Sequence, residues 1–269
     1  MSFDEATAVE QVGDTRFAAR VHDGWSIAGN ANGGYLLAIA ARAMRDASGR
    51  PDPVSVTAHY LRPGRPGPAT VDVEPVKTGK AFSVVRATLS SAEEPLLSLL
   101  GTFGTLADSE ASAPMLVDAR PPDLPPVEDC VRMPATADFP PPFMAKVDLR
   151  LHPDDAAFML GERSGLARMR GWFAFPDGEG AGTHVDTIGL LQAADAFPPT
   201  IFNTELPVAW TPTVELTAHV RAVPTQGPLR CAFTTHFVTG GFLEADGEIW
   251  DGTGRLVGQS RQLALVPRT

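Results

Sequence analysis

A repeat at a fixed spacing is the feature that most constrains how this chain can fold. When the sequence is compared with itself at the offset that takes position 54 to position 214, residues of the same type coincide, including Val54 with Val214, Thr57 with Thr217, Ala58 with Ala218, His59 with His219, Gly67-Pro68 with Gly227-Pro228, Phe82 with Phe242 and Leu96 with Leu256. Chance matches between strands of similar composition are the alternative interpretation. Order and turn position persist at this repeat offset over about fifty residues, so we interpret the repeat as a tandem duplication of one small unit.

The first half predicts one buried helix followed by an antiparallel meander. Residues 14–27 alternate loosely, as a strand or strand pair does. Asn30 or Asn32 can cap a helix that Gly49 and Pro51 end, and this helix is apolar on nearly every side. Strand-like runs with turn residues between them follow at 54–62, 69–78, 82–91 and 95–106. One helix beside such a meander is an α+β pattern.

A proline-rich segment separates the two halves. Nine of the chain's 25 prolines lie between Pro114 and Pro142. Such a segment cannot form a helix or an interior strand. We therefore predict an N-terminal unit over 1–106, an extended linker over 107–145 and a C-terminal unit over 146–269.

The second half repeats the order of elements. Residues 146–151 and 167–175 are typical of strands, and 183–197 (THVDTIGLLQAADAF) predicts a helix that Pro198-Pro199 ends. Further strands are expected at 213–222, 229–239, 242–250 and 255–266.

Charge and composition exclude several classes of function. The formal net charge of -10 argues against non-specific binding to nucleic acid or to anionic membranes. No apolar run reaches the length of a membrane helix, and the acidic N-terminus is unlike a signal peptide. The two cysteines, Cys130 and Cys231, show no metal-ligand spacing, so a reducing cytoplasm is the simplest expectation.

Several short motifs, taken in order, resemble one family. In the first half they are 31–37 (ANGGYLL), with a Gly-Gly entry to a helix, and 59–64 (HYLRPG), a strand end; in the second half they are 194–199 (ADAFPP), 213–219 (TVELTAH) and 257–262 (VGQSRQ). Their order and spacing resemble the acyl-CoA thioesterase II family and its thioesterase-like relatives, although each motif alone is weak. Glu215 departs from a common pattern that has Asp, and segment 205–212 (ELPVAWTP) is individual and is expected to shape the pocket.

The resemblance implies a double hot-dog fold, in which each tandem unit wraps a long antiparallel sheet around a central helix. It implies hydrolysis of acyl-CoA thioesters by water, with no cofactor and no metal, and acyl-CoA as the partner molecule. Further association of such chains into a homodimer or a higher oligomer is expected. A non-catalytic acyl-thioester-binding protein is the alternative function. A hot-dog hydratase or dehydratase is disfavoured because its usual adjacent Asp and His are missing from a helix-linked segment.

The resemblance also implies a catalytic group of Asp195, Thr213 and Gln262. A carboxylate can accept the proton of a water, while a hydroxyl and an amide fix the direction of that water. Asp195 ends an otherwise apolar helix, where burial would raise its pKa. The alternative, an exposed or capping Asp, is disfavoured because a carboxylate opposes the dipole at a helix C-terminus. Thr213 is also common at strand starts, and Gln262 could be merely solvated.

Four further residues are candidates for contacts with the substrate. Gly33 and Gly34, at a predicted helix N-terminus, can present backbone N–H groups to an oxyanion, although close helix–sheet packing explains them equally well. Arg62 and Arg65 could contact the phosphates of coenzyme A, but solvated turn residues are the simpler interpretation. His59 and His219 are repeated in both halves, so we interpret them as residues of a strand face.

Other hydrolase patterns are missing from the sequence. Residues 258–262 (GQSRQ) lack the final glycine of a serine-hydrolase elbow, and 152–155 (HPDD) is a turn-like cluster without a ligand set for a metal. The candidate catalytic residues do not recur in the first half, although the strands do. At the repeat offset, Asp195, Thr213 and Gln262 meet Tyr35, Pro53 and Thr102. We therefore expect one half to carry the polar group and the other to supply scaffold and groove wall.

Overall fold

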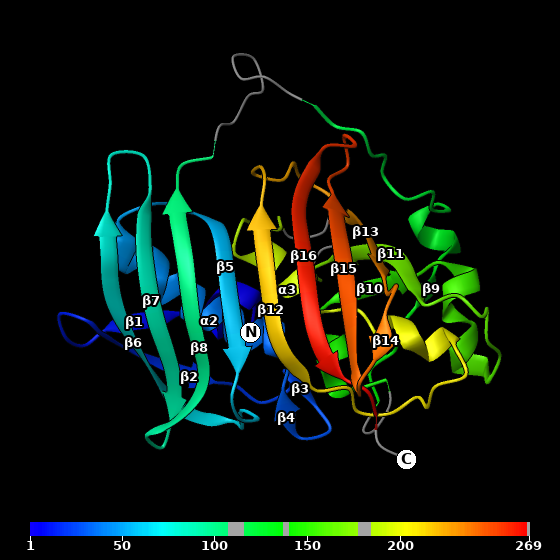
Figure 1. Ribbon diagram of the computed structural model, residues 1–269, viewed down its shortest axis with the longest axis horizontal. Helices are drawn as coiled ribbons and strands as arrows, with labels where there is room; N and C mark the ends of the chain where they lie inside the picture. Colours follow the sequence, from blue (N-terminus) through cyan, green and yellow to red (C-terminus); the bar gives the residue numbers. More distant parts are fainter. Residues whose placement is uncertain (107–115, 137–139, 177–183, 268–269) are drawn as a thin grey trace.

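A single curved antiparallel sheet of 14 strands organises the molecule (Figure 1). The computed structural model describes residues 1–106, 116–136, 140–176 and 184–267. The first half of the chain forms one side of the sheet and the second half forms the other. The strand order is β1-β2-β6-β7-β8-β5-β12-β16-β15-β13-β11-β10-β9, with β14 paired to β15.

The first half contains the predicted helix and meander. Its elements are α1 (Phe3–Ala6), β1 (Val9–Gln11), β2 (Arg16–Val21), β3 (Ser26–Ile27), β4 (Asn30–Ala31), α2 (Gly33–Ser48), β5 (Asp52–Tyr60), β6 (Gly67–Thr78), β7 (Ser83–Ser91) and β8 (Glu94–Gly104). Strands β3 and β4 form a separate two-stranded ribbon. The α+β class and the order of elements predicted for this half are confirmed.

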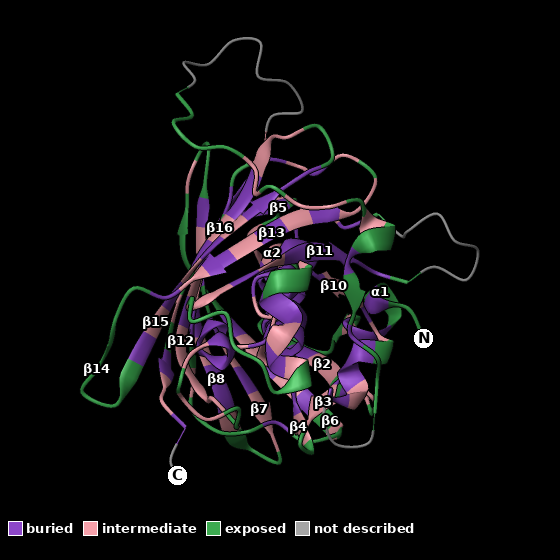
Figure 2. Cartoon of the chain, turned by 90° about the vertical axis from the view of Figure 1, so that its right-hand side faces the viewer, coloured by how far each residue is buried: buried purple, intermediate pink, exposed green. Residues whose placement is uncertain are grey.

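Helix α2 is the buried centre of the first half. Asn32 caps it, because the Asn32 Oδ1 atom accepts a hydrogen bond from the Tyr35 backbone N–H at 3.0 Å. Gly49 ends the helix in a left-handed conformation (φ 63°), which glycine adopts without a steric penalty. Eleven consecutive residues from Gly34 to Met44 are buried, as predicted from the apolar character of every side. Figure 2 shows the helix inside the curve of the sheet.

The second half has a longer list of short elements. They are the 3₁₀ helix η1 (Val127–Asp129), β9 (Val131–Arg132), η2 (Pro142–Ala145), β10 (Asp148–Leu151), η3 (Pro153–Leu160), β11 (Arg168–Ala174), α3 (Gly189–Ala193), η4 (Thr200–Asn203), β12 (Thr213–Val220), β13 (Leu229–Thr234), β14 (Val238–Thr239), β15 (Phe242–Trp250) and β16 (Leu256–Leu265).

The predicted helix over 183–197 is wrong in its length. The helix α3 has only five residues, Gly189–Ala193, and Thr183 lies outside the described part of the chain. Before it, the Asp186 side chain accepts the Gly189 N–H at 2.6 Å, which holds a turn instead of an earlier helical start. After it, the chain leaves the helix ahead of Pro198-Pro199. The short helix leaves the following residues free to line a cavity.

The proline-rich segment contributes structure to the second half. Within the described part, Val131 and Arg132 form the edge strand β9, which pairs with β10. Residues 107–115 and 137–139 of the predicted linker lie outside the described residues. Where the two units begin and end remains a prediction.

The two halves join at β5 and β12, which lie side by side at the centre of the sheet (Figure 1). In this antiparallel pair Thr57 lies opposite Thr217, and their hydroxyl oxygens are 2.9 Å apart. These two residues are equivalents at the repeat offset. A pseudo-two-fold axis therefore passes between them. The strand order agrees, because β8, β7, β6 and β2 on one side match β16, β15, β13 and β11 on the other.

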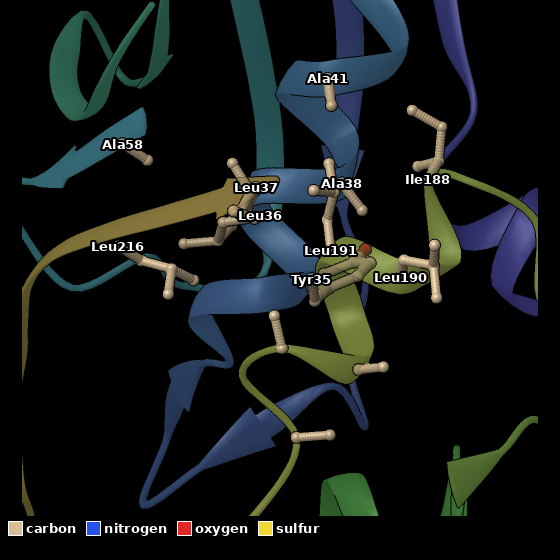
Figure 3. Packing of buried hydrophobic residues seen from close by; sticks show 14 of the residues in the cluster. Tyr35, Leu36, Leu37, Ala38, Ala41, Ala58, Ile188, Leu190, Leu191 and Leu216 are labelled. Atoms are coloured by element: carbon tan, nitrogen blue, oxygen red, sulfur yellow. The ribbon is translucent and has the colours of Figure 1, made fainter. Parts of the chain in front are cut away.

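Helices α2 and α3 pack against each other beneath this join. Figure 3 shows Tyr35 and Ala38 of α2 near Leu190 and Leu191 of α3. All four are buried, as are the neighbouring residues on the central strands, such as Ala58 and Leu216. Within the described ranges, none of the helices combines the length and apolar character that crossing a membrane requires.

Candidate active site

The carboxylate of Asp195 is held where the two halves meet. Its Oδ1 atom accepts a hydrogen bond from Gln262 Nε2 at 3.0 Å. Its Oδ2 atom accepts bonds from the Gly34 N–H at 2.7 Å and from Asn32 Nδ2 at 3.2 Å. Asn32 Nδ2 also lies 3.0 Å from the backbone oxygen of Asp195. Donors from both halves therefore fix the position of one carboxylate.

Burial changes the acidity of Asp195. Desolvation raises the pKa of this carboxyl from 3.8 to about 6, because the charged form loses contact with water. Hydrogen bonds from Gly34, Gln262 and Asn32 oppose the rise by stabilising the charged form. The carboxylate is thus charged at neutral pH but more basic than an exposed aspartate. This combination suits a general base.

The structure brings Thr213 and Gln262 to Asp195. Thr213 begins β12 at a bulge in the pairing with β16, and bulges re-aim side chains. Gln262 shares the inner face of β16 with the buried Ser260 and Ala264, so it is not a solvated residue of the outer face. Its Nε2 atom lies 2.5 Å from Thr213 Oγ1. The three side chains form one hydrogen-bonded chain across three elements.

The two glycines allow the helix N-terminus to approach this carboxylate. A Cβ atom on Gly34 would lie 3.0 Å from the Asp195 Cβ and 3.1 Å from the Gln192 backbone oxygen. A Cβ on Gly33 would lie 2.8 Å from Asp195 Oδ2. The Gly34 N–H is directed at Asp195 in this structure. The role of both glycines as oxyanion donors stays a prediction.

The sequence did not predict the part played by Asn32 and Gln192 in this site. Gln192 is fully buried, and its Nε2 atom donates to Asn32 Oδ1 at 2.8 Å. Asn32 in turn donates to Asp195, so Gln192 holds the Asn32 amide in the orientation that binds the carboxylate. Asn32 and Gln192 are also equivalents at the repeat offset. That coincidence of two amide side chains is the signal that would have revealed them.

The predicted phosphate-binding arginines differ in position. Arg62 lies at the cavity, where its side chain is half-exposed and sits 3.6 Å from Glu94. Arg65 is exposed and is not among the residues that line the cavity. His59 and His219 are exposed on β5 and β12, as interpreted from their repetition. Among the described residues, no three side chains of the ligating types gather to hold a metal ion.

A cavity of about 670 Å³ opens beside Asp195, Thr213 and Gln262. Gly33, Tyr60 and Arg62 line it from the first half. The second half contributes mainly apolar side chains, among them Met133, Phe143, Met144, Phe197, Phe202, Trp210, Phe233, Leu243, Ala245 and Leu265. Residues 208–212 of the individual segment also line it, as expected. A few polar groups within a largely apolar lining are what an acyl thioester requires of a binding site.

Comparisons with known proteins agree with the fold. Residues 21–104 match the model of the acyl-CoA thioesterase N-terminal domain, and residues 127–266 match the model of the C-terminal domain. A protein of Thermobifida fusca with the provisional name thioesterase II has a similar structure, with a TM-score of 0.89, 33% identity, and coverage of 99% of this chain and 97% of that one.

More distant relatives share the architecture. The acyl-CoA thioesterase II TesB2 of Mycobacterium marinum superposes with a TM-score of 0.72 at 18% identity, over 100% of this chain and 99% of that one. An uncharacterised protein of Mycobacterium tuberculosis is 26% identical over 93% of this chain and 91% of its own length.

The fold defines the class: this is a tandem hot-dog protein of the thioesterase type. The chain belongs to the acyl-CoA thioesterase family, whose N-terminal and C-terminal domain models it matches in order. The family supports acyl-thioester hydrolysis as the general activity.

Proposed function

We propose that this protein hydrolyses acyl-CoA thioesters to a free acid and coenzyme A, with water as the nucleophile. The observation that carries the proposal is the hydrogen-bonded chain of Asp195, Gln262 and Thr213 in the lining of a largely apolar cavity. A site built only to bind acyl groups has no need for a desolvated carboxylate. The energetic cost of burying this charge is explained if it takes up a proton during the reaction.

In the proposed mechanism Asp195 removes a proton from a water as that water attacks the thioester carbon. The Thr213 hydroxyl accepts from Gln262, which leaves its own hydrogen free to orient the water. The carbon–sulfur bond then breaks, and the proton held by Asp195 neutralises the departing thiolate. The acid and the thiol leave together, and the chemistry consumes only water.

The apolar residues of the second half are proposed to hold the acyl chain. Burial of methylene groups against Phe233, Leu243 and Leu265 contributes about 0.8 kcal/mol per group. Arg62, which also lines the cavity, is the proposed contact for the phosphates of coenzyme A. Its exposed partner Glu94 provides only a weak competing interaction.

The test is release of free thiol from purified protein supplied with acyl-CoAs of short, medium and long chains. Hydrolysis that depends on Asp195 is the expected result. A folded protein that binds acyl-CoA without releasing thiol from any chain would overturn the proposal in favour of a binding protein.

We also propose a cytoplasmic location and association of two chains. Both cysteines of the chain, Cys130 and Cys231, are buried free thiols, which suits a reducing compartment. Large apolar side chains are exposed on the outer part of β14 and β15, including Val238 and Phe242. Light scattering of the purified protein measures the mass, and a monomer at micromolar concentration would remove the association from the proposal.

A further inference from the structure

One buried hydroxyl at the site has no partner. The oxygen of Tyr60 is shielded from bulk water and makes no hydrogen bond within the described structure. An unpaired buried hydroxyl costs about 1–3 kcal/mol. Native proteins leave few such groups, and each one calls for a reason.

The Tyr60 ring lies beside the catalytic group. The point where a Cβ of Gly33 would sit is 2.8 Å from Tyr60 Cε1, 3.1 Å from Tyr60 Cζ and 2.8 Å from Asp195 Oδ2. Tyr60 also lines the cavity, at the end of β5 where this strand runs beside the start of β12. The phenol and the carboxylate therefore flank the same small volume at the start of α2.

The other donors at this place are already engaged. The Gly34 N–H, Asn32 Nδ2 and Gln262 Nε2 all donate to Asp195. The Thr213 hydrogen is assigned to the attacking water in the proposed mechanism. The carbonyl oxygen of a thioester acquires negative charge as water attacks and requires a donor of its own.

We propose that the Tyr60 hydroxyl is a further catalytic residue, which donates a hydrogen bond to the carbonyl oxygen of the substrate. This inference rests on the proposed function and assigns the oxyanion donor to a side chain of the first half. Substrate supplies the partner that the free protein lacks. Hydrogen bonds in catalytic sites commonly form or tighten only when substrate is bound.

The chemistry of the phenol agrees with a donor role. Burial, with the nearby charges of Asp195 and Glu215, raises the pKa of Tyr60 well above its ordinary value. The hydroxyl therefore keeps its proton at neutral pH. It can donate to an oxyanion but cannot act as a base or a nucleophile.

The decisive variant is Tyr60→Phe, which removes one oxygen atom and keeps the ring. We expect kcat to fall by about 10²-fold, in the range seen when one oxyanion donor is removed, with little change in KM. The midpoint of thermal unfolding should stay the same or rise, because the variant removes an unsatisfied buried group. A purely structural hydroxyl would give the opposite pattern, with lower stability and unchanged kcat.

Tyr35→Phe is the matched control, since Tyr35 is the other of the chain's two tyrosines. Its hydroxyl is satisfied, because it accepts from the His22 N–H at 3.0 Å and donates to the Ala6 oxygen at 2.9 Å. Loss of these bonds should lower the midpoint of unfolding. The kcat of the folded fraction should remain that of the parent protein.

A binding measurement separates this inference from the proposed hydrolysis. One ligand is a ketone analogue of acyl-CoA in which a methylene replaces the sulfur, and the other is an S-alkyl-CoA without the carbonyl. Tyr60→Phe should weaken the ketone by about 2–10-fold, the usual worth of one hydrogen bond, and leave the S-alkyl ligand unchanged. Equal affinity of parent and variant for the ketone would overturn the role of Tyr60, whether or not the parent hydrolyses thioesters.

Discussion

The two halves share a strand order but differ in their central helix, and the difference locates the chemistry. In the first half α2 runs for 16 residues and fills the curve of the sheet. In the second half α3 has five residues, and the chain after it passes Asp195 and lines the cavity. The long helix supplies an N-terminus and a rigid wall. The short helix leaves space for substrate and ends near the carboxylate.

The first-half residues that are equivalent to the proposed catalytic group have a different role. Tyr35, the counterpart of Asp195 at the repeat offset, is fully buried and stacks on Trp25 with ring centroids 4.8 Å apart. Pro53, the counterpart of Thr213, is buried on β5. These residues pack as core. The first half therefore has a filled hydrophobic interior at these positions, whereas the second half has a buried carboxylate.

Of the variants that test this difference between the halves, Asp195→Asn should have the largest effect on kcat. The variant keeps the shape of the side chain but removes the base, so we expect kcat to fall by at least about 10²-fold. The matched control is Asp52→Asn in the first half. Asp52 is also buried and accepts bonds from Thr187 Oγ1 at 3.0 Å and the Leu106 N–H at 2.9 Å. Asp52→Asn should lower the stability of the protein and leave kcat unchanged. Near-normal turnover of Asp195→Asn would remove the Asp195 carboxylate from the mechanism.

Gly34→Ala should come next, because Gly34 lies at a close contact between the two halves. The new Cβ would meet the Asp195 Cβ and the Gln192 backbone oxygen at 3.0 and 3.1 Å, so one of the helices must shift. Displacement of the carboxylate by a few tenths of an ångström should lower kcat by roughly 10-fold or more. Overpacking should cost about 1–3 kcal/mol of unfolding free energy.

Gly252→Ala provides the comparison for Gly34→Ala. The nearest neighbour of its new Cβ would be the Gln226 oxygen at 3.8 Å, which is an ordinary contact. The kcat and the unfolding free energy of this variant should match those of the parent protein. If Gly34→Ala also behaves like the parent, the close approach of α2 to Asp195 has no functional weight.

The pH dependence of hydrolysis tests the environment of Asp195. The proposed base acts only when ionised, and the pKa of Asp195 is raised to about 6. The value of kcat/KM should therefore fall about tenfold per pH unit below pH 6 and level off above it. Gln262→Ala removes a donor that lowers this pKa, so the midpoint should move to higher pH and the plateau should drop by about tenfold.

Gln259→Ala is the control for the pH experiment. Gln259 lies three positions earlier on β16, and its Oε1 atom accepts from Arg221 at 2.9 Å, away from Asp195. Its profile should coincide with that of the parent. A midpoint that stays at the same pH in Gln262→Ala would show that another group controls the profile.

The sequence predicted the parts of this arrangement that depend on local pattern. Asn32 as one of two candidate caps, Gly49 as the end of the helix, the apolar surface of α2 and the succession of strands along the chain all follow from residue type and spacing. The resemblance to a family supplied Asp195, Thr213 and Gln262, which the structure places in contact. The repeat also relates Thr57 to Thr217, and the register of β5 with β12 places these two residues opposite each other.

The features that escaped prediction depend on contacts between the halves. The length of α3 is set by the turn at Asp186 and by packing on α2, not by the helix propensity of 183–197. Asn32 was predicted only as a cap, and its bonds to Gln192 and Asp195 join positions in opposite halves of the chain. Tyr60 carried no signal, because an unpaired hydroxyl is defined by everything around it.

The smallest expected effect lies at the pseudo-two-fold axis itself. The hydroxyls of Thr57 and Thr217 meet there at 2.9 Å, and Thr217 also bonds Glu215. Valine keeps the branched shape that strands favour. Thr57→Val and Thr217→Val should therefore each change the unfolding free energy by less than about 1 kcal/mol without altering kcat.

The double variant measures what the symmetric pair contributes. In a double-mutant cycle a coupling of about 0.5–1 kcal/mol between Thr57 and Thr217 would show that the pair helps to hold the halves together. No coupling would mean that the Thr57–Thr217 hydrogen bond follows from the duplication and does not stabilise the protein. In either case kcat should stay unchanged. The threonine pair at the axis affects only how the two halves pack together, whereas the proposed chemistry takes place at Asp195, where the halves differ in sequence.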